Sequence, residues 1–368
     1  MKFKKLLIGA LALTSIAFVS CTTSNNAFFD YYKHAMKVNE LKNYNQESEL
    51  QLKLYSEDEK LNKEINDSLQ AFGINKPVAN VTLNSKINKL NDIDVISSSD
   101  YSLKLGNFNF SSSVYIDDQN VAMKLPKELS GSDKWQVSKL YTEEEKNQLY
   151  NFYDIQNKYK NEFPKLQKTF ETIYKAADAN DLKYTSDKNT VNFTLKVNDD
   201  KKFADFGYFA FSELLKDENF RSILSDISND SLKTLSPDIT GVASTVQSIT
   251  EIETELNDFK NMSSEEIAKK LDELKVDYDK AVDEFIKAAS FKGSYMINTI
   301  NKDTLEVTTE ILVKVQINVT DETKDLFDNF ENKSPIIIEY SQKSVTKPSN
   351  DVVEKIKFTK ENSEFIDE

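Results

Sequence analysis

A long stretch of strict alternation near the end of the chain constrains the fold more than any other sequence feature. In residues 305–319 the odd-numbered positions hold Leu, Val, Thr or Ile, whereas the even-numbered ones are mainly Glu, Thr, Lys, Gln and Asn. Successive side chains of a strand point to opposite faces, so this pattern predicts a strand about 50 Å long with one apolar face. Residues 293–300 would pair with it through a turn at 301–303, and residues 336–340 predict a further strand.

The same period of two recurs earlier in the chain. In residues 46–55, Leu50, Leu52 and Leu54 share one face, and charged or amide side chains occupy the other. The hairpin expected at residues 114–125 turns at 117–120, where Asp and Asn favour a turn. Together these segments predict a sheet that is mainly antiparallel. The other alternating segments are 81–87, 101–105 and 191–197.

Helical periodicity separates the groups of strands. Apolar residues recur at three- and four-residue steps in residues 28–41, 149–177, 203–216 and 267–289. Thr142 with Glu145, and Ser263 with Glu266, have the spacing of capping boxes and predict two helix starts. Pro164 predicts a kink or a break within the second segment, because proline lacks the N–H that a helix interior needs. Residues 355–367 predict a C-terminal tail that packs only weakly against the rest of the chain.

The first 21 residues combine a cationic start, a short apolar run and a terminal cysteine. Lys2, Lys4 and Lys5 precede the apolar residues 6–19, which are too few to span a bilayer comfortably. Val19-Ser20-Cys21 resembles the lipobox of bacterial lipoproteins, although Phe18 departs from the usual Leu, Val or Ile. The resemblance implies a signal peptide at 1–20, lipidation of Cys21 with a diacylglyceryl group, and a short tether to residue 26. An ordinary secretory signal with a chance cysteine is the alternative.

The charge and the residue types exclude several classes of function. The chain carries 61 acidic against 47 basic residues, which disfavours binding to nucleic acid. Cys21 is the only cysteine and His34 the only histidine, so the common zinc sites and the nucleophile–histidine catalytic sets are absent. Acidic clusters such as 143–145 fit the first turns of helices. We therefore expect no catalytic residue, no metal and no cofactor.

Aromatic residues are the remaining candidates for binding. The segment FGYFAF at residues 206–211 covers all sides of a helix, and a second aromatic cluster lies at 28–32. We predict Phe28, Tyr32, Phe206 and Phe209 as contacts for an apolar ligand. Burial in an ordinary core is the alternative.

The order of elements resembles a known family. Three features carry this resemblance, namely the segment VYIDDQNVAMKLP at 114–126, the single Trp135 and the segment TVNFTLKVNDD at 190–200. Together they resemble the LolA-like lipoprotein-carrier half-barrel superfamily and its Gram-positive lipoprotein relatives. The resemblance covers about residues 27–347. It implies a curved antiparallel sheet around helices, with acyl chains or another apolar ligand in the gap, and it carries over no functional residue except Cys21.

We therefore predict an α+β domain at 27–368, with a long curved antiparallel sheet, a half-barrel, and helices packed on its concave face. Residues of about 217–290 would form a helical insertion, or else a separate domain. The expected function is that of a monomeric, non-enzymatic lipoprotein, anchored to the extracytoplasmic face of a membrane, that binds a lipid or an acylated molecule. The alternative is a surface adhesin or an envelope scaffold that acts through protein–protein contacts of residues 263–289.

Overall fold

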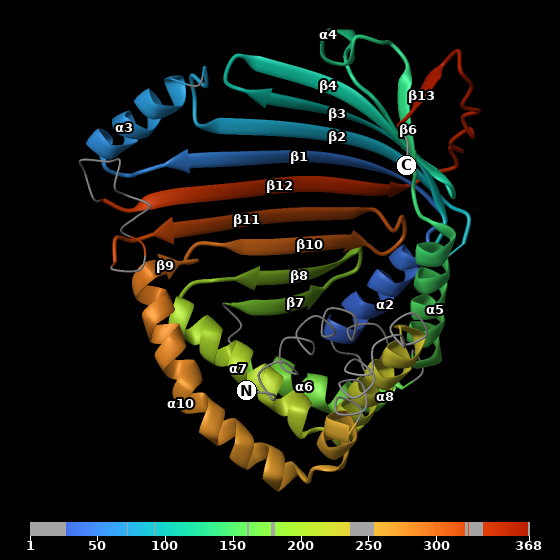
Figure 1. Ribbon diagram of the computed structural model, residues 1–368. Helices are drawn as coiled ribbons and strands as arrows, with labels where there is room; N and C mark the ends of the chain where they lie inside the picture. Colours follow the sequence, from blue (N-terminus) through green and yellow to red (C-terminus); the bar gives the residue numbers. More distant parts are fainter. Residues whose placement is uncertain are drawn as a thin grey trace, which may run out of the picture. The chain divides into compact units, whose positions relative to one another are not determined.

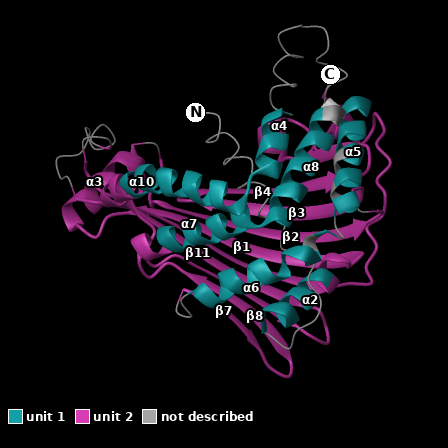
Figure 2. Cartoon of the chain, turned by 90° about the horizontal axis from the view of Figure 1, so that it is seen from below, with its two compact units in different colours: residues 1–36, 142–177, 204–280 teal, residues 37–141, 178–203, 281–368 magenta. Residues whose placement is uncertain are grey.

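The computed structural model describes residues 27–71, 73–91, 93–159, 162–177, 181–235, 254–320, 323 and 334–366. Cys21, the predicted signal peptide and the tether lie outside these residues. The chain divides into two compact units (Figure 2). The helical unit comprises residues 1–36, 142–177 and 204–280, and the sheet unit comprises residues 37–141, 178–203 and 281–368. The helical unit contains the N-terminal helix and the segment after residue 141 together with residues 204–280, and the predicted insertion at about 217–290 stays a prediction.

Thirteen strands of the described chain form one sheet in the order β13-β6-β5-β4-β3-β2-β1-β12-β11-β10-β8-β7, with β9 on β11. Figure 1 shows this sheet as a curved, open surface, which confirms the predicted α+β fold with a long curved sheet. The sheet is mixed, however, because β13 pairs in parallel with β6. The placement of helices on the concave face stays a prediction. The strands are β1 (Asn43–Tyr55), β2 (Val78–Lys89), β3 (Val95–Leu105), β4 (Phe108–Ile116), β5 (Asn120–Lys124), β6 (Trp135–Lys139), β7 (Leu182–Ser186), β8 (Thr190–Lys196), β9 (Ala289–Ser290), β10 (Tyr295–Asn301), β11 (Val307–Ile317), β12 (Ile336–Pro348) and β13 (Ser363–Phe365).

The strand predicted at residues 305–319 is shorter at both ends. Leu305 has a φ of 57°, which is the left-handed region and ends the extended conformation there. The side chain of Asn301 accepts hydrogen bonds from the N–H groups of Asp303 and Thr304, at 3.0 and 2.9 Å, and so fixes the turn. Strand β11 therefore begins at Val307.

The first and the last long strands are neighbours in the middle of the sheet. Strand β1 pairs antiparallel with β12 over nearly its whole length, with Leu52 opposite Tyr340 and Leu54 opposite Ile338. On its other side β1 pairs with β2. The centre of the sheet therefore depends on pairing between residues that are almost 300 positions apart, from both ends of the chain.

Two apolar clusters hold the sheet unit together. Helix α3 (Glu59–Gln70) packs Leu61 and Ile65 against Ile336 at one end of the sheet, with Leu54 and Ile317 beside them. Asp58 caps this helix by accepting hydrogen bonds from the N–H groups of Lys60 and Leu61, both at 3.0 Å. Helix α4 (Lys127–Ser130) is a single short turn between β5 and β6.

The second cluster corrects the expectation of a weakly held tail. Val353 is buried with Ile96, Tyr115, Ala122 and Val137, and Trp135, Ile356 and Phe358 pack against them. The N–H of Val353 donates to the side-chain oxygen of the buried Asn88. The N–H of Ile356 donates to the hydroxyl of Tyr115 at 3.1 Å. The C-terminal segment is therefore part of the core of the sheet unit.

The helices begin where the capping signals predict. The side-chain oxygens of Thr142 and Ser263 accept from the N–H groups of Glu145 and Glu266, and both glutamates bond back at 2.8 Å. Pro164 lies in a 3-10 turn, η2 (Phe163–Leu166), that splits the predicted helix in two. The other helices within the described residues are α2 (Ala27–Asn39), α5 (Glu143–Tyr159), α6 (Gln167–Ala176), α7 (Asp200–Lys216), α8 (Glu218–Leu235) and α10 (Ser264–Ala288).

Candidate ligand-binding face

One face of the sheet carries most of its apolar side chains. The registers of β1, β2, β3, β4, β11 and β12 place residues that are opposite one another on the same side of the sheet. Leu50 thus shares a face with Val81, Leu103 and Phe110, because these positions follow one another across four strands. We call this side the apolar face. It is formed by Leu50, Leu52, Val81, Leu83, Leu103, Leu105, Phe108, Phe110, Ile311, Val313, Val315, Ile338 and Tyr340.

The apolar face is only partly covered. Val307 and Ile336, which the registers place on the same side, are buried, and helix α3 packs against Ile336. None of the residues named above is buried, and Leu52 and Phe108 are 48% and 52% exposed. On the opposite side of the same sheet, Tyr115, Ala122 and Val137 are completely buried. Each Å² of apolar surface left in water costs about 25 cal/mol, so folding alone does not favour such a surface. A contiguous exposed apolar surface is typical of a binding site.

The apolar face also has a polar centre. Ser48 and Ser344 are adjacent on β1 and β12 and are both buried. The hydroxyl of Tyr340 donates to the side-chain oxygen of Gln342 at 2.7 Å. Phe108 and Phe110 stack with ring centroids 6.5 Å apart, and Tyr101 lies 5.6 Å from Phe110. A ligand on this face would meet short side chains in the middle and aromatic rings on β3 and β4.

The four predicted ligand contacts all belong to the helical unit. On α2, Phe28 and Tyr32 are buried, and the ring of Phe28 stacks on Tyr174 at 5.9 Å. On α7, Phe206 and Phe209 are partly buried. His34 is also buried on α2, and its ring nitrogen Nδ1 lies 2.8 Å from the carbonyl oxygen of Asp30. The role of the four aromatic residues as ligand contacts stays a prediction.

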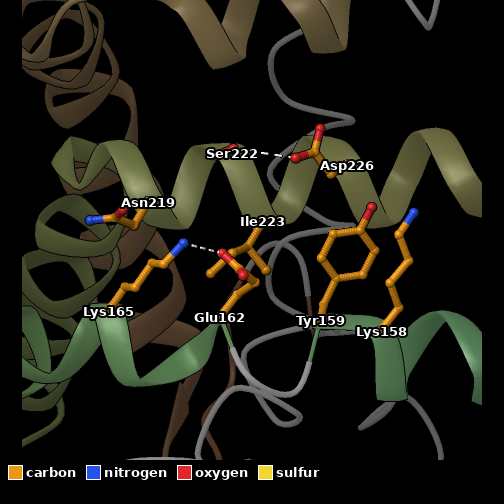
Figure 3. A pocket seen from close by; sticks show the side chains of 8 residues that line it. All are labelled: Lys158, Tyr159, Glu162, Lys165, Asn219, Ser222, Ile223 and Asp226. Atoms are coloured by element: carbon orange, nitrogen blue, oxygen red, sulfur yellow. Dashed lines mark hydrogen bonds and ion pairs between the residues drawn. The ribbon is translucent and has the colours of Figure 1, made fainter.

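The helical unit contains a small polar pocket of about 210 Å³ (Figure 3). The C-terminal end of α5 and the residues around η2 form one side of this pocket, and α8 forms the other. Lys158 forms an ion pair with Asp230 at 2.6 Å, Lys165 forms one with Glu162, and Lys260 forms one with Asp226 at 2.6 Å. Burial raises the pKa of Tyr159, whose hydroxyl also donates to Asp230 at 2.8 Å. The cations and carboxylates at this pocket are therefore paired with one another.

Alternation along single strands identifies the apolar side chains, but it does not reveal that they stay open to solvent. The alternation of apolar residues that marks the apolar face is present in residues 46–55 and 305–319. In β12, Gln342 and Ser344 occupy positions on that face, so the alternation identifies only the start of this strand. Exposure depends on what packs against the face, and no local pattern contains that information.

No protein-family model matches the chain, and comparisons with curated proteins and with solved structures give no significant match. None of the described helices has the length and apolarity needed to cross a bilayer. The described residues also contain no group of three or more His, Cys, Asp or Glu side chains placed to hold a metal ion.

Proposed function

We propose that this protein is a membrane-anchored, extracytoplasmic lipoprotein without enzymatic activity, and that it binds a hydrophobic ligand on the apolar face. The ligand class is a lipid or an acylated molecule. Lipidation of Cys21 would hold the protein at the membrane, where such ligands are found. The observation that carries the proposal is that apolar side chains which share one face of the sheet are only partly buried, with Leu52 and Phe108 48% and 52% exposed.

The shape and chemistry of the apolar face support an elongated apolar ligand. Its side chains extend over six strands, and neighbouring strands lie about 4.8 Å apart, so the face is about 24 Å wide. Aliphatic and aromatic groups dominate, and none of the residues that we assign to this face has a charged side chain. Burial of a CH₂ group is worth about 0.8 kcal/mol, so an acyl chain gains affinity with each carbon it places there.

Native mass spectrometry of protein purified from its host tests the proposal. We expect a bound lipid or acylated molecule that is released on unfolding. Phe108→Ser should lower the bound fraction, because it removes an aromatic ring from the apolar face. Phe365→Ser is the matched control, because Phe365 on β13 is similarly exposed, at 56%, and belongs to a different strand pair.

The same measurement decides between the proposal and its alternative. A stable protein partner without bound lipid would contradict ligand binding and would favour an adhesin or a scaffold. Val276 on α10 is 73% exposed and would be a natural position to test in that case.

A further inference from the structure

A hollow of about 460 Å³ crosses the other side of the sheet, over β2, β1, β12, β11 and β10. One wall is a row of four residues, Thr82, Glu49, Lys343 and Glu310, which the registers place side by side. The second wall lies two residues further along β2, β1 and β12 and contains Asn80, Gln51 and Ser341, with Tyr295 on β10 beyond Leu312 of β11. We call this hollow the polar groove.

The backbone forms the floor of the polar groove. Val81, Leu50, Gln342 and Ile311 lie between the two walls, and they also line the hollow. Because side chains alternate along a strand, those of Leu50 and Ile311 point to the apolar face, away from the groove. The polar groove is therefore separate from the surface that we propose for the hydrophobic ligand.

The walls offer many hydrogen-bonding groups that are only partly used. The side-chain N–H of Gln51 donates to the side-chain oxygen of Asn80 at 2.7 Å. A carboxamide has two N–H donors and an acceptor with two lone pairs, so this bond leaves further donors and acceptors on both residues. Lys343 and Glu310 form an ion pair at 3.4 Å, with side chains 60% and 41% exposed. Glu49 is exposed beside them.

These groups fit a neutral ligand rich in hydroxyl groups. The walls carry the carboxylates of Glu49 and Glu310 and the ammonium group of Lys343, a net charge of −1, which disfavours an anion and gives only a weak preference for a cation. A peptide that binds as an additional strand needs unpaired backbone N–H and C=O groups on the sheet. The backbone groups of the groove floor are already paired with neighbouring strands in the antiparallel ladder. Vicinal hydroxyl groups of a ligand both donate and accept hydrogen bonds, so they can pair with the amide, carboxylate and ammonium groups of the walls. The ring of Tyr295 can stack on the apolar side of a sugar ring.

We propose that the polar groove binds a neutral oligosaccharide chain. The groove crosses five strands that lie about 4.8 Å apart, so it is about 19 Å long and accommodates several sugar units. The walls stand on strands that are paired with their neighbours in the sheet, which favours a preformed site. This site is independent of the proposed lipid binding, since the two use opposite sides of the sheet.

Isothermal titration calorimetry tests this proposal with three probes: cellohexaose, maltohexaose and the hexamer of N-acetylglucosamine. We expect at least one hexasaccharide to bind saturably and glucose to bind much more weakly. Gln51→Ala should weaken that binding at least about tenfold. Lys343→Gln is the second variant, because its exposed side chain can be changed without loss of the fold. Asn109→Ala is the matched control, since Asn109 is exposed on the same side of the sheet but outside the groove.

Several results would overturn the proposal. These are the absence of binding by all three hexasaccharides, unchanged binding by both folded groove variants, or binding of penta-alanine in place of a saccharide. Phe108→Ser should leave saccharide binding unchanged, so a failure of this proposal and a failure of the lipid proposal are distinguishable.

Discussion

Arg221 is the only arginine of the chain, and its side chain is completely buried in the helical unit. Its guanidinium donates to the carbonyl oxygens of Leu215 and Lys216, both at 2.8 Å, and to that of Met262 at 2.7 Å. The first two lie at the C-terminal end of α7, where carbonyl groups lack helical partners. Arg221 thus joins the end of α7 to Met262, two positions before α10, and the planar guanidinium suits this task because it donates in several directions.

Replacing Arg221 should destabilise the helical unit strongly. Arg221→Met removes three hydrogen bonds and leaves buried carbonyl oxygens unsatisfied, so we expect a loss of about 3 kcal/mol in the free energy of unfolding. Arg221→Lys should recover only part of this, because an ammonium group cannot reproduce the planar fork. Urea unfolding of both variants measures the effect. Lys269→Ala, at an exposed position on α10, should change stability by less than about 0.5 kcal/mol. An equally small effect of Arg221→Met would contradict the assigned role.

Cys21 is the residue on which the proposed anchoring depends. Cys21→Ala should abolish incorporation of labelled fatty acid and move the protein from the membrane fraction to the soluble fraction, since two or more acyl chains are needed for stable anchoring. Fractionation of cells that express the variant measures this. If the variant still partitions fully with membranes, the anchor is not at Cys21.

At the scale of elements, two capping boxes begin helices α5 and α10. The carboxylates of Glu145 and Glu266 accept hydrogen bonds from the backbone N–H and the hydroxyl at the cap, and these bonds lower the pKa of both carboxyls. A carboxyl whose pKa is lower in the folded state stabilises the fold above its ordinary pKa of about 4.3, and this contribution is lost as the pH falls through the lowered value.

The effect of Glu266→Gln should therefore depend on pH. Above about pH 5 the variant should be less stable than the wild type, because the amide lacks the negative charge that favours the N-terminus of α10. As the pH falls through the lowered pKa of Glu266, the difference should disappear. Thermal unfolding at a series of pH values measures it, with Glu361→Gln as an exposed control outside any helix. A difference that grows towards acidic pH would contradict this sign.

The elements themselves were largely predictable from local chemistry. Alternation at β1 and β11, the two capping boxes and Pro164 all predict structure that the fold contains. The missed features depend on distant partners. Strand β12 continues to Pro348 through Gln342, Ser344 and Thr346, since it is held by β1 and β11 on both sides. The C-terminal segment joins a core only because Tyr115 and Val137 come to lie beneath it.

At the scale of the whole molecule, the sheet unit has two faces with different chemistry. The apolar face leaves aliphatic and aromatic side chains open, and the other side combines the polar groove with the core that the C-terminal segment covers. The sequence predicts which residues share a face, because alternation is local. It could not predict Leu52 and Phe108 as the candidate site, because the openness of a face follows from the packing of the entire chain.

Photolabelling tests the central claim, that the apolar face binds a hydrophobic ligand, most directly. The full-length protein would be irradiated with a fatty acid that carries a diazirine near its methyl end, and the modified peptides would be identified by mass spectrometry. We predict labels on β1, β4, β11 and β12, at or beside Leu52, Phe108, Val313 and Tyr340, and their suppression by excess unlabelled fatty acid. Labels confined to other segments, or labels that excess fatty acid does not suppress, would contradict the claim.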